Sequence, residues 1–404
     1  MASFNLACID RDAHCDWNAL KDRYLEGGGD VRGFRSEIGT DWCKEPKTIS
    51  DSEIASLGTI RELQHKLRAT GFMPHGEIDG IYGYRTLSSL RLFQEYVRGI
   101  EGDKSMDVDG IFGPETSNVL NSWVSSNRTA DWADPHGRYK KAMAGLPRIK
   151  EYFLDSDLKE VKLLNQRAAI SDSRAVKDWT FDPGEVHLVG IRRRVDYTKV
   201  DHKERTVREN DDLFVLLVNG MLWVFRGSTD PSPYMADRKD IPFLLRGQHE
   251  YRNGWHQWSR EASYRAFRPA NKGVLVVRSV DGNQLSDASY DQIQEPNPTI
   301  NIHWSGAGGF NYSAGCQVIA ANHYKDFRNE TVDLTDRVSI GQKDLSSKKT
   351  RGAYNTMLDL VTVFQKESGR KGSKLLYTLL WEEDVGNALG DTEADFAGAV
   401  KALT

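Results

Sequence analysis

The chain has 404 residues, more than a single hydrophobic core usually organises, so we expect two or three domains. Hydrophobic residues make up 39% of it and aromatic residues 10%, which is typical of a globular protein and excludes a mainly disordered one. The formal net charge is -4 and no long basic tract occurs, so the sequence does not indicate a nucleic-acid-binding protein. We interpret Arg192, Arg193 and Arg194 as a solvated strand edge and not as a phosphate site.

The first residues, MASFNLACIDRDAHCDWNALKDRY, have no positively charged start and no apolar stretch of signal-peptide length. We therefore expect a protein made in the cytoplasm without a Sec-type export signal. The longest apolar runs, such as 213–218, are much shorter than the roughly 20 residues needed to cross a bilayer. No membrane span is expected.

Four cysteines occur, at positions 8, 15, 43 and 316. A zinc site formed by Cys8, His14, Cys15 and Cys43 can be written down, but its spacing matches no strong zinc motif. Reduced structural cysteines are the favoured interpretation of these three thiols. Cys316 stands apart and is considered separately.

Residues 1–57 combine an amphipathic stretch with the flexible run Gly27-Gly28-Gly29, and we interpret them as a lead-in or docking segment. From Ile60 the pattern changes. Ile60, Leu63 and Leu67 recur at helical spacing, and Gly71 is a suitable terminator. The sequence predicts a short amphipathic helix there.

An internal repeat follows this helix. The segment IDGIYGYRT at 78–86 recurs as VDGIFGPET at 108–116, thirty positions later. Asp-Gly predicts a tight turn, the Ile and the aromatic residue are expected to enter the core, and Thr86 or Thr116 can N-cap a helix. Each unit is therefore predicted to be a turn followed by a helix.

This pattern resembles the peptidoglycan-binding domain 1 family, a small three-helix module. Its hallmarks are matched by Leu63-Gln64, Gly71-Phe72, the run Asp79-Gly80-Ile81-Tyr82-Gly83, Thr86 and Phe93-Gln94. The resemblance implies that a module at 58–125 binds peptidoglycan. Its candidate binding residues are Asp79, Tyr82, Arg85, Asp109 and Phe112. The alternative is a helical spacer that has kept the fold and lost the ligand.

The remaining chain falls into two regions that differ in residue composition and pattern. Residues 126–182 are rich in charged residues and helix formers, which predicts a helical linker. From residue 183 to 404 β-rich runs predominate, and Asn219-Gly220 between two of them is a strong hairpin signal. The expected fold class is thus α+β and multidomain, with a three-helix module and a mostly β domain with flanking helices.

The segment PTINIHWSGAGGFNYSAGCQVIAA at 298–321 carries the most chemistry. A β-like run delivers His303, and a glycine-rich loop then leads to Cys316. A nucleophilic thiol needs a base, donors for the oxyanion, and backbone room for substrate, which glycines provide. His303 lies thirteen positions before Cys316, so the loop can bring imidazole and thiol together. The alternative is a structural cysteine beside a buried histidine.

The segment resembles the YkuD-like L,D-transpeptidase family, whose signature is a His, a loop, and then Ser/Thr-His-Gly-Cys. The resemblance implies that Cys316 is the nucleophile and His303 its base, with Ser305 or a nearby carbonyl orienting the imidazole. Backbone N–H groups of Gly315 and Cys316 are candidate oxyanion donors, and Ser313 holds the loop or contacts substrate.

This sequence departs from the family pattern at three points. Ala314 replaces the usual second histidine, Gln317 occupies a normally hydrophobic position, and the loop between His303 and Cys316 is shorter than the family norm. A divergent member of the family is therefore expected.

Residues 244–269 are unusually aromatic and punctuated by glycine, so they are candidates for lining a substrate groove. Arginine can pair with stem-peptide carboxylates, and aromatic rings can stack on sugar or peptide. The candidate substrate-binding residues are Arg246, His249, Tyr251, Trp255, His256, Trp304, Asn311 and Tyr312. The alternative is that the aromatic residues complete a core.

The function expected from the two resemblances is cysteine acyl transfer on tetrapeptide stems of peptidoglycan, as an L,D-transpeptidase or an L,D-carboxypeptidase. Two alternatives use other chemistry or none: endopeptidase cleavage by the same thiol, and a non-enzymatic wall-binding or particle-structural protein. A zinc peptidase is a minor alternative, because His187, His202, His249, His256 and His303 form no paired ligand motif. No metal or cofactor is expected.

The expected partner is peptidoglycan, without nucleic acid. A wall substrate and a missing export signal together indicate that another machine delivers the protein to the cell wall or periplasm. We therefore expect an antibacterial effector or lysis factor with secretion-system or phage-particle components, and an immunity protein, as further partners.

Overall fold

The computed structural model describes eleven stretches of the chain. These are 59–80, 82–193, 198–201, 203–233, 240–256, 264–280, 285–291, 295–306, 309–339, 349–366 and 374–389. The predicted docking segment at 1–57, with Cys8, His14, Cys15 and Cys43, lies outside them. Arg194, His202 and the side chain of Trp255 lie outside them too.

The described residues belong to two compact units. The first contains the chain up to Trp132 together with Asn253–Ala266 and Val332–Ser373. The second contains Ala133–Arg252, Phe267–Thr331 and the chain from Lys374 onward. The predicted domain at 183–404 is therefore divided, since two of its segments lie in the first unit.

The first unit is helical. Its elements are α4 (Ile60–Ala69), α5 (Tyr84–Glu95), the π-helical turn η2 (Tyr96–Ile100), α6 (Pro114–Ser125) and α10 (Ala353–Phe364). The predicted first helix is confirmed: Thr59 caps α4 in a capping box with Glu62, and Gly71 follows the helix with a φ of +86°.

The two repeats build the same buried network around a glutamine. The Gln64 amide donates to Asp79 (2.9 Å) and Thr86 (3.0 Å), and its oxygen accepts from the Gly80 N–H.

Thirty residues later, the Gln94 amide donates to Asp109 (3.1 Å) and Thr116 (3.2 Å), and its oxygen accepts from the Gly110 N–H. Thr86 and Thr116 are thus not N-caps. Gly83 and Gly113 occupy the cap positions, and each threonine lies in the first turn, where its hydroxyl accepts from glutamine.

Aromatic rings fill the core of the first unit. Phe72 contacts Phe93, Tyr96 and Trp123 at centroid distances of 5.2–5.7 Å. Helix α10 is joined to α5 by a buried two-point ion pair between Arg91 and Asp359. Sequence far from the repeats therefore completes this unit.

Most of a closed eight-stranded barrel lies in the second unit, while the end of β7 and the start of β8 belong to the first. Its strand order is β10-β8-β7-β14-β1-β4-β5-β12, and a parallel β10–β12 pairing closes the ring. The strands are β1 (His187–Arg192), β4 (Asp212–Val218), β5 (Met221–Ser228), β7 (Gly247–His256), β8 (Tyr264–Pro269), β10 (Ile302–Trp304), β12 (Gln317–Lys325) and β14 (Leu375–Trp381). Closure removes the exposed sheet edges.

The β4–β5 hairpin is confirmed. Asn219 and Gly220 both have positive φ, 49° and 80°, as a two-residue type I′ turn requires. The strands pair in register from Val218 with Met221 to Asp212 with Gly227. Every residue of β1 and β4 is buried, so both faces of these strands are covered.

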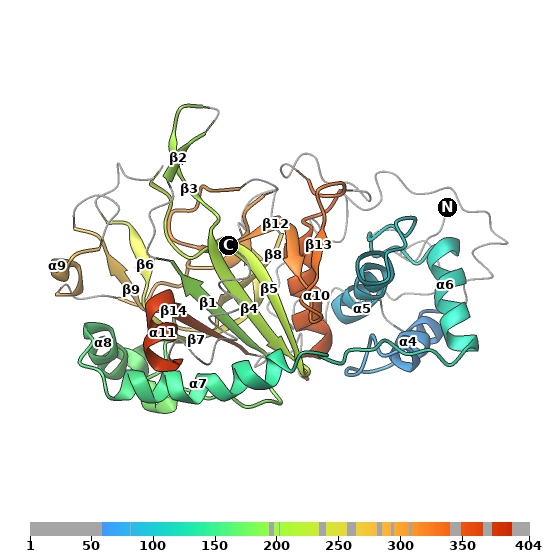
Figure 1. Cartoon of the computed structure of the whole chain (residues 1–404), viewed down its shortest axis with the longest axis horizontal. Helices are drawn as coiled ribbons and strands as arrows, with labels where there is room; N and C mark the ends of the chain where they lie inside the picture. Colours follow the sequence, from blue (N-terminus) through green and yellow to red (C-terminus); the bar gives the residue numbers. More distant parts are fainter. Residues whose placement is uncertain are drawn as a thin grey trace. The chain divides into compact units, whose positions relative to one another are not determined.

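Helices cover the outside of the barrel. They are α7 (Arg138–Leu154), α8 (Lys159–Arg167), α9 (Asp287–Tyr290) and α11 (Glu382–Leu389), with short 3-10 turns at Ala168–Ile170 and Val176–Asp178. Leu146, Ile149 and Phe153 of α7 share one core with Val189 and Ile191 of β1. Residues 133–182 therefore pack as part of this unit and not as the predicted linker (Figure 1).

Two smaller sheets lie beside the barrel. One joins β2 (Thr198–Val200), β3 (Thr206–Glu209) and β11 (Phe310–Asn311), and the β2–β3 hairpin projects from the barrel in Figure 1. The other pairs β6 (Pro242–Leu244) with β9 (Val276–Arg278). A last short strand, β13, spans Thr331–Asp333. The expected α+β class is confirmed.

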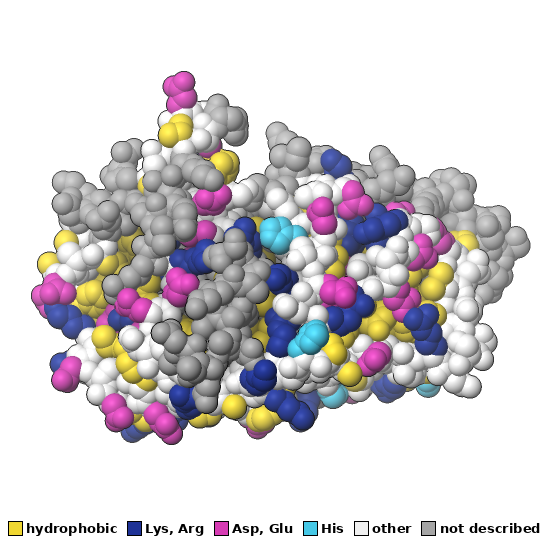
Figure 2. Space-filling view, viewed as in Figure 1, with side chains coloured by type: hydrophobic (Ala, Val, Ile, Leu, Met, Phe, Trp, Pro, Cys, Tyr) yellow, Lys and Arg dark blue, Asp and Glu magenta, His cyan; other side chains and the backbone are white. Residues whose placement is uncertain are grey.

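The surface in view carries both signs of charge. Figure 2 shows Lys and Arg side chains interspersed with Asp and Glu side chains over this face. Within the described ranges, no helix has the length and apolar character that crossing a bilayer requires.

Candidate functional site

Cys316 precedes β12, where that strand meets β10. Its Sγ accepts from the Asn301 N–H and lies in donating geometry to the Thr299 carbonyl, both at 3.3 Å. The Gln317 N–H donates to the Asn301 carbonyl (2.9 Å), which continues the parallel pairing of Gln317 with Ile302. The thiol is therefore fixed against the backbone of the neighbouring chain segment.

His303 lies on β10, one strand away from Cys316. Its register partner is Val318, and side chains alternate along a strand, so Asn301, His303, Cys316 and Val318 face the same side. The His303 Nδ1 is 2.9 Å from the Trp304 carbonyl oxygen. A carbonyl can only accept, so Nδ1 carries the proton and the basic lone pair is on Nε2.

Burial sets the protonation states of both groups. It lowers the pKa of His303 to about 4 and raises the pKa of the Cys316 thiol. At neutral pH the pair is therefore a neutral imidazole and a thiol, and not a preformed ion pair. The positive charge of Arg268, which lies on β8 next to Phe267, the partner of Ile302, acts in the opposite direction on the thiol.

Hydrogen bonds hold the loop before Cys316. The Asn311 amide donates to the Asp230 carbonyl (2.7 Å) and its oxygen accepts from the Ser313 N–H (2.6 Å). The Ser313 hydroxyl accepts weakly from the Gly315 N–H at 3.3 Å. Gly315 has a φ of +150°, and a Cβ there would lie 2.7 Å from the Pro242 carbonyl oxygen. This close approach requires glycine.

Cys316 opens into a cavity of about 400 Å³. We call it the cysteine cavity. It is lined by Pro242, Arg278, Glu295, Pro296, Asn297, Pro298, Thr299, Ile300, Ala314, Gly315 and Cys316. Of the predicted site residues that the structure describes, only Gly315 and Cys316 line it. Arg278, Glu295 and the proline-rich wall were not predicted. Glu295 and the prolines precede β10 closely, whereas Arg278 ends β9 and had no signal in the sequence.

Within the described ranges, the Ser305 hydroxyl is bonded to groups other than the His303 imidazole. Its hydroxyl accepts from the Asn210 amide (2.9 Å) and donates to the Phe310 carbonyl (3.1 Å). Of the two orienting groups considered for His303, the structure thus favours the nearby carbonyl, that of Trp304. The Trp304 side chain itself is buried.

Several candidate substrate residues lie in the core instead. His249 is fully buried, with ring nitrogens 2.8 Å from the Ser173 hydroxyl and from the Leu245 carbonyl, and burial lowers its pKa to about 4. Tyr251 and Asn311 are also fully buried. For these residues the structure favours packing over substrate contact, because a side chain without solvent access cannot meet a ligand.

The other candidates are distributed elsewhere. Tyr312 is partly exposed, and its hydroxyl donates to Asp201 at 3.1 Å. His256 belongs to the first unit, where its ring packs on Tyr264. Arg246 is buried between Glu160 and Asp384 and lines a different cavity.

Arg192 overturns one expectation directly. It was predicted to lie on a solvated strand edge with Arg193 and Arg194, but its side chain is only 1% exposed. It pairs with Asp230 at 2.7 Å and donates to the Thr229 carbonyl. The opposite charge of Asp230 and these acceptors make burial possible.

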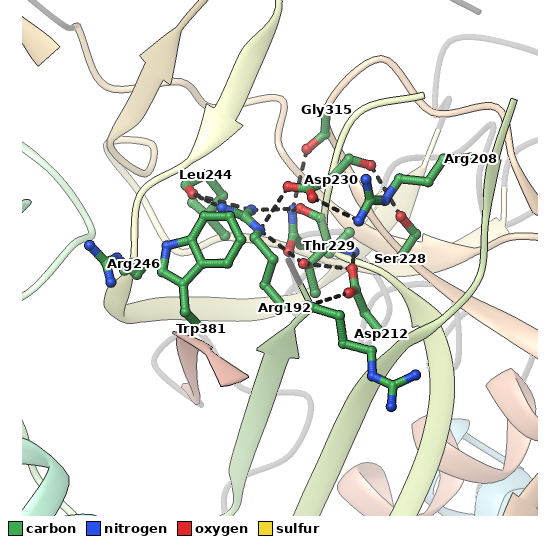
Figure 3. A network of polar contacts seen from close by, with 12 residues as sticks. Arg192, Arg208, Asp212, Ser228, Thr229, Asp230, Leu244, Arg246, Gly315 and Trp381 are labelled. Atoms are coloured by element: carbon green, nitrogen blue, oxygen red, sulfur yellow. Dashed lines mark hydrogen bonds and ion pairs between the residues drawn. The ribbon is translucent and has the colours of Figure 1, made fainter. Parts of the chain in front are cut away.

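A polar network links the Arg192–Asp230 ion pair to the loop that precedes Cys316 (Figure 3). The Gln317 amide donates to the Thr229 carbonyl (3.1 Å) and lies 3.4 Å from the Gly315 carbonyl, while its oxygen accepts from Tyr377. Gln317, one of the residues that depart from the YkuD-like pattern, therefore fixes the backbone next to Cys316.

No cluster of three or more His, Cys, Asp or Glu side chains that could hold a metal ion occurs among the described residues. His187, one member of the minor zinc hypothesis, is buried and bonded to the Asp182 carbonyl at 2.8 Å.

The candidate residues of the helical module mostly build it. Tyr82, Asp109 and Phe112 are buried, and the Tyr82 hydroxyl donates to the Gly110 carbonyl at 2.6 Å. Asp79 accepts from Gln64, and Arg85 donates to the carbonyls of Val363 and Gln365. The repeated motif therefore specifies the framework.

Comparison with known proteins identifies the first of the two regions. Residues 57–120 match the family described as "Putative peptidoglycan binding domain". This confirms the resemblance predicted for 58–125. No curated protein and no solved structure matches the chain. The YkuD-like family does not match it either, and the barrel has no family assignment.

Proposed function

We propose, from the peptidoglycan-binding domain at 57–120, that the barrel is a cysteine acyl-transfer domain acting on the peptide stems of the same polymer. The observation that carries the proposal is the placement of Cys316. Its thiol lines a cavity of about 400 Å³ and lies on the same side of neighbouring parallel strands as His303. The reaction class is that of an L,D-transpeptidase or L,D-carboxypeptidase on tetrapeptide stems.

The protonation states define how the thiol is activated. The His303 imidazole is neutral at neutral pH, because its pKa is about 4, and it can accept a proton at Nε2. Because the Cys316 Sγ lies in donating geometry to the Thr299 carbonyl, transfer to His303 requires the thiol to turn away from that carbonyl. Proton transfer then accompanies attack and does not precede it.

The proposed reaction has two steps, acylation of Cys316 and release of the acyl group. Sγ bonds to the carbonyl carbon of the amide after the third stem residue, and the thiol proton passes to His303. The carbon–nitrogen bond breaks, and the leaving amine of D-alanine takes the proton from the imidazolium. Water or a second amine then attacks the thioester, which returns the thiol. Water gives a carboxypeptidase, and an amine gives a transpeptidase.

The cysteine cavity offers cationic groups to an anionic substrate. Arg278 and Glu295 both line it, and the Arg278 Nη1 donates to the Asp240 carbonyl at 2.8 Å and pairs with the Asp240 carboxylate at 3.4 Å. Arg268 adds a second positive charge near the thiol. Stem peptides carry carboxylates, which guanidinium groups bind in a two-point geometry. The protein would act where this polymer lies, in the cell wall.

The test uses defined tetrapeptide muropeptides with and without a free D-amino acid, and product masses are recorded. We expect the wild-type protein to yield tripeptide or exchanged product, and Cys316→Ala to lower the rate by about 10³-fold or more. Cys8→Ala is the matched control, because it removes another thiol of the chain and should keep full activity.

Each other outcome has a defined meaning. Monomers released from cross-linked dimers would identify an endopeptidase that uses the same thiol. Unchanged substrates with the wild-type protein would overturn the enzymatic proposal in favour of a wall-binding protein. Sedimentation with isolated peptidoglycan should be equal for wild type and Cys316→Ala, since the binding domain is separate in sequence.

A further inference from the structure

A second cavity lies within the barrel unit and shares no lining residue with the cysteine cavity. Its volume is about 510 Å³. Three arginines line it, Arg193, Arg208 and Arg246, so we call it the arginine cavity. Phe243 and Trp381 provide apolar walls. None of these features is used by the proposed chemistry of Cys316.

Two of the three guanidinium groups are paired with carboxylates of the protein. Arg246 lies 2.6 Å from Glu160 and 2.8 Å from Asp384. Arg208 pairs with Asp230 at 3.1 Å and shares this carboxylate with Arg192. Buried ion pairs of this kind are rigid parts of the wall, because each of these arginines has a carboxylate within the fold.

Arg193 differs from the other two. It is 8% exposed, and its Nε is buried without a hydrogen-bond partner. Across the described part of the chain, its guanidinium group forms no ion pair or hydrogen bond. A buried and uncompensated charge is costly, by roughly several kcal/mol in real proteins. A fold retains such a group at low cost only when a ligand supplies the missing charge.

The nearest counter-charge is incomplete. Continuing the β1–β4 register places Arg193 opposite Asp211, and both carboxyl oxygens of Asp211 are buried without hydrogen bonds. Burial and the neighbouring Asp212 raise the pKa of Asp211 to about 7, although Arg193 opposes this shift. At neutral pH Asp211 therefore gives Arg193 only part of a negative charge.

We propose that the arginine cavity binds a small carboxylate-bearing ligand of the amino-acid or short-peptide class, with its carboxylate on Arg193. The fork of donors on a guanidinium group matches a carboxylate in two-point contact. Phe243 and Trp381 would cover the hydrocarbon part of the ligand. That this ligand is a stem peptide, or an amino acid released from one, rests on the proposed function. The binding site itself does not.

Hydrogen bonds connect the arginine cavity to the loop that precedes Cys316. Asp230 lines the arginine cavity, and its backbone carbonyl accepts from Asn311, which in turn accepts from the Ser313 N–H. Figure 3 shows the Asp230 side chain between Arg192 and Arg208, beside the network that reaches Gly315. A ligand that changes the pairing of Asp230 would therefore act on the loop that carries the nucleophile.

Binding is tested by calorimetry on the full-length Cys316→Ala protein, so that no turnover is needed. The probes are D-alanine, a stem tripeptide and inorganic phosphate. We expect saturable binding of a carboxylate probe to the Cys316→Ala protein. Addition of the Arg193→Gln substitution to this protein should weaken the binding by about tenfold or more. Arg328→Gln is the matched control, because Arg328 pairs with Asp326 and lines neither cavity, and it should change the affinity by less than about twofold.

A second measurement separates ligand binding from a structural role of Arg193. Without ligand, Arg193→Gln should raise the melting temperature, because it removes an uncompensated charge. A lowered melting temperature would overturn the proposal. Equal binding by the proteins with and without Arg193→Gln would also overturn it, and so would the absence of binding by every probe at millimolar concentration. Binding of phosphate alone would overturn the carboxylate assignment. None of these results depends on whether Cys316 is catalytic.

Discussion

The peptidoglycan-binding domain and the barrel both bury polar networks, but they assemble them differently. In the domain, Gln64 and Gln94 each bind an Asp-Gly turn and a threonine within 22 residues of their own position. In the barrel, Arg192 pairs with Asp230 across 38 positions, and Arg246 pairs with Asp384 across 138. A network formed between near neighbours in the chain recurs when the sequence motif recurs. A network between distant strands leaves no periodic pattern in the sequence.

The largest expected effect concerns the barrel network. Arg192→Met removes one partner of a buried pair and leaves Asp230 without its 2.7 Å contact. We expect a loss of about 3–5 kcal/mol in the free energy of unfolding, measured by urea denaturation. Lys159→Met is the control, since its partners Asp287 and Asp291 are exposed, and it should cost about 0–1 kcal/mol. Equal losses would show that the Arg192 pair is not a buried element.

The second prediction compares the two glutamines of the binding domain. Gln94→Ala removes a hydrogen bond from four buried groups, which should cost about 2–3 kcal/mol in the free energy of unfolding. Gln64→Ala should cost less, about 1–2 kcal/mol, because Asp79 is only partly buried and water can replace the amide. Denaturation of both variants checks the order. A larger loss for Gln64→Ala than for Gln94→Ala would contradict the expected effect of the difference in burial.

The third prediction concerns the pH dependence of the proposed acyl transfer. The reaction needs neutral His303, and burial lowers its pKa to about 4. The rate should therefore be retained as pH falls from 7 to 5, and then decrease about tenfold per unit below pH 4. Rates corrected for the folded fraction measure this. A decrease centred near the ordinary histidine pKa of 6.5 would show that His303 is exposed or is not the base.

The smallest expected effect concerns Asp211. Its pKa is raised from 3.8 to about 7, so the folded protein holds a proton that the unfolded chain releases. The contribution of this group to stability should therefore fall as pH rises through this interval. Asp211→Asn should stabilise the protein by about 1 kcal/mol at pH 8 and leave stability at pH 4 nearly unchanged. Melting curves at both pH values test the difference, and a stabilisation that is equal at both would refute the assignment.

Local sequence determined much of this protein. The helix at Ile60–Ala69, the β4–β5 hairpin at Asn219-Gly220 and the binding domain at 57–120 follow from short-range patterns, because caps, turns and a thirty-residue repeat act between near neighbours. The thirteen-residue spacing between His303 and Cys316 belongs to the same class, since strands β10 and β12 pair directly.

Only the tertiary structure decided the surroundings of these residues. Closure of the barrel buried Arg192 and His249, drew α7 onto the core, and placed Arg278 and a proline-rich wall around the thiol. Among the described residues, it also left the Arg193 Nε buried without a hydrogen-bond partner. Such outcomes depend on which distant strands become neighbours, and burial of a charge is decided by that pairing, so the spacing of residues along the chain does not contain them.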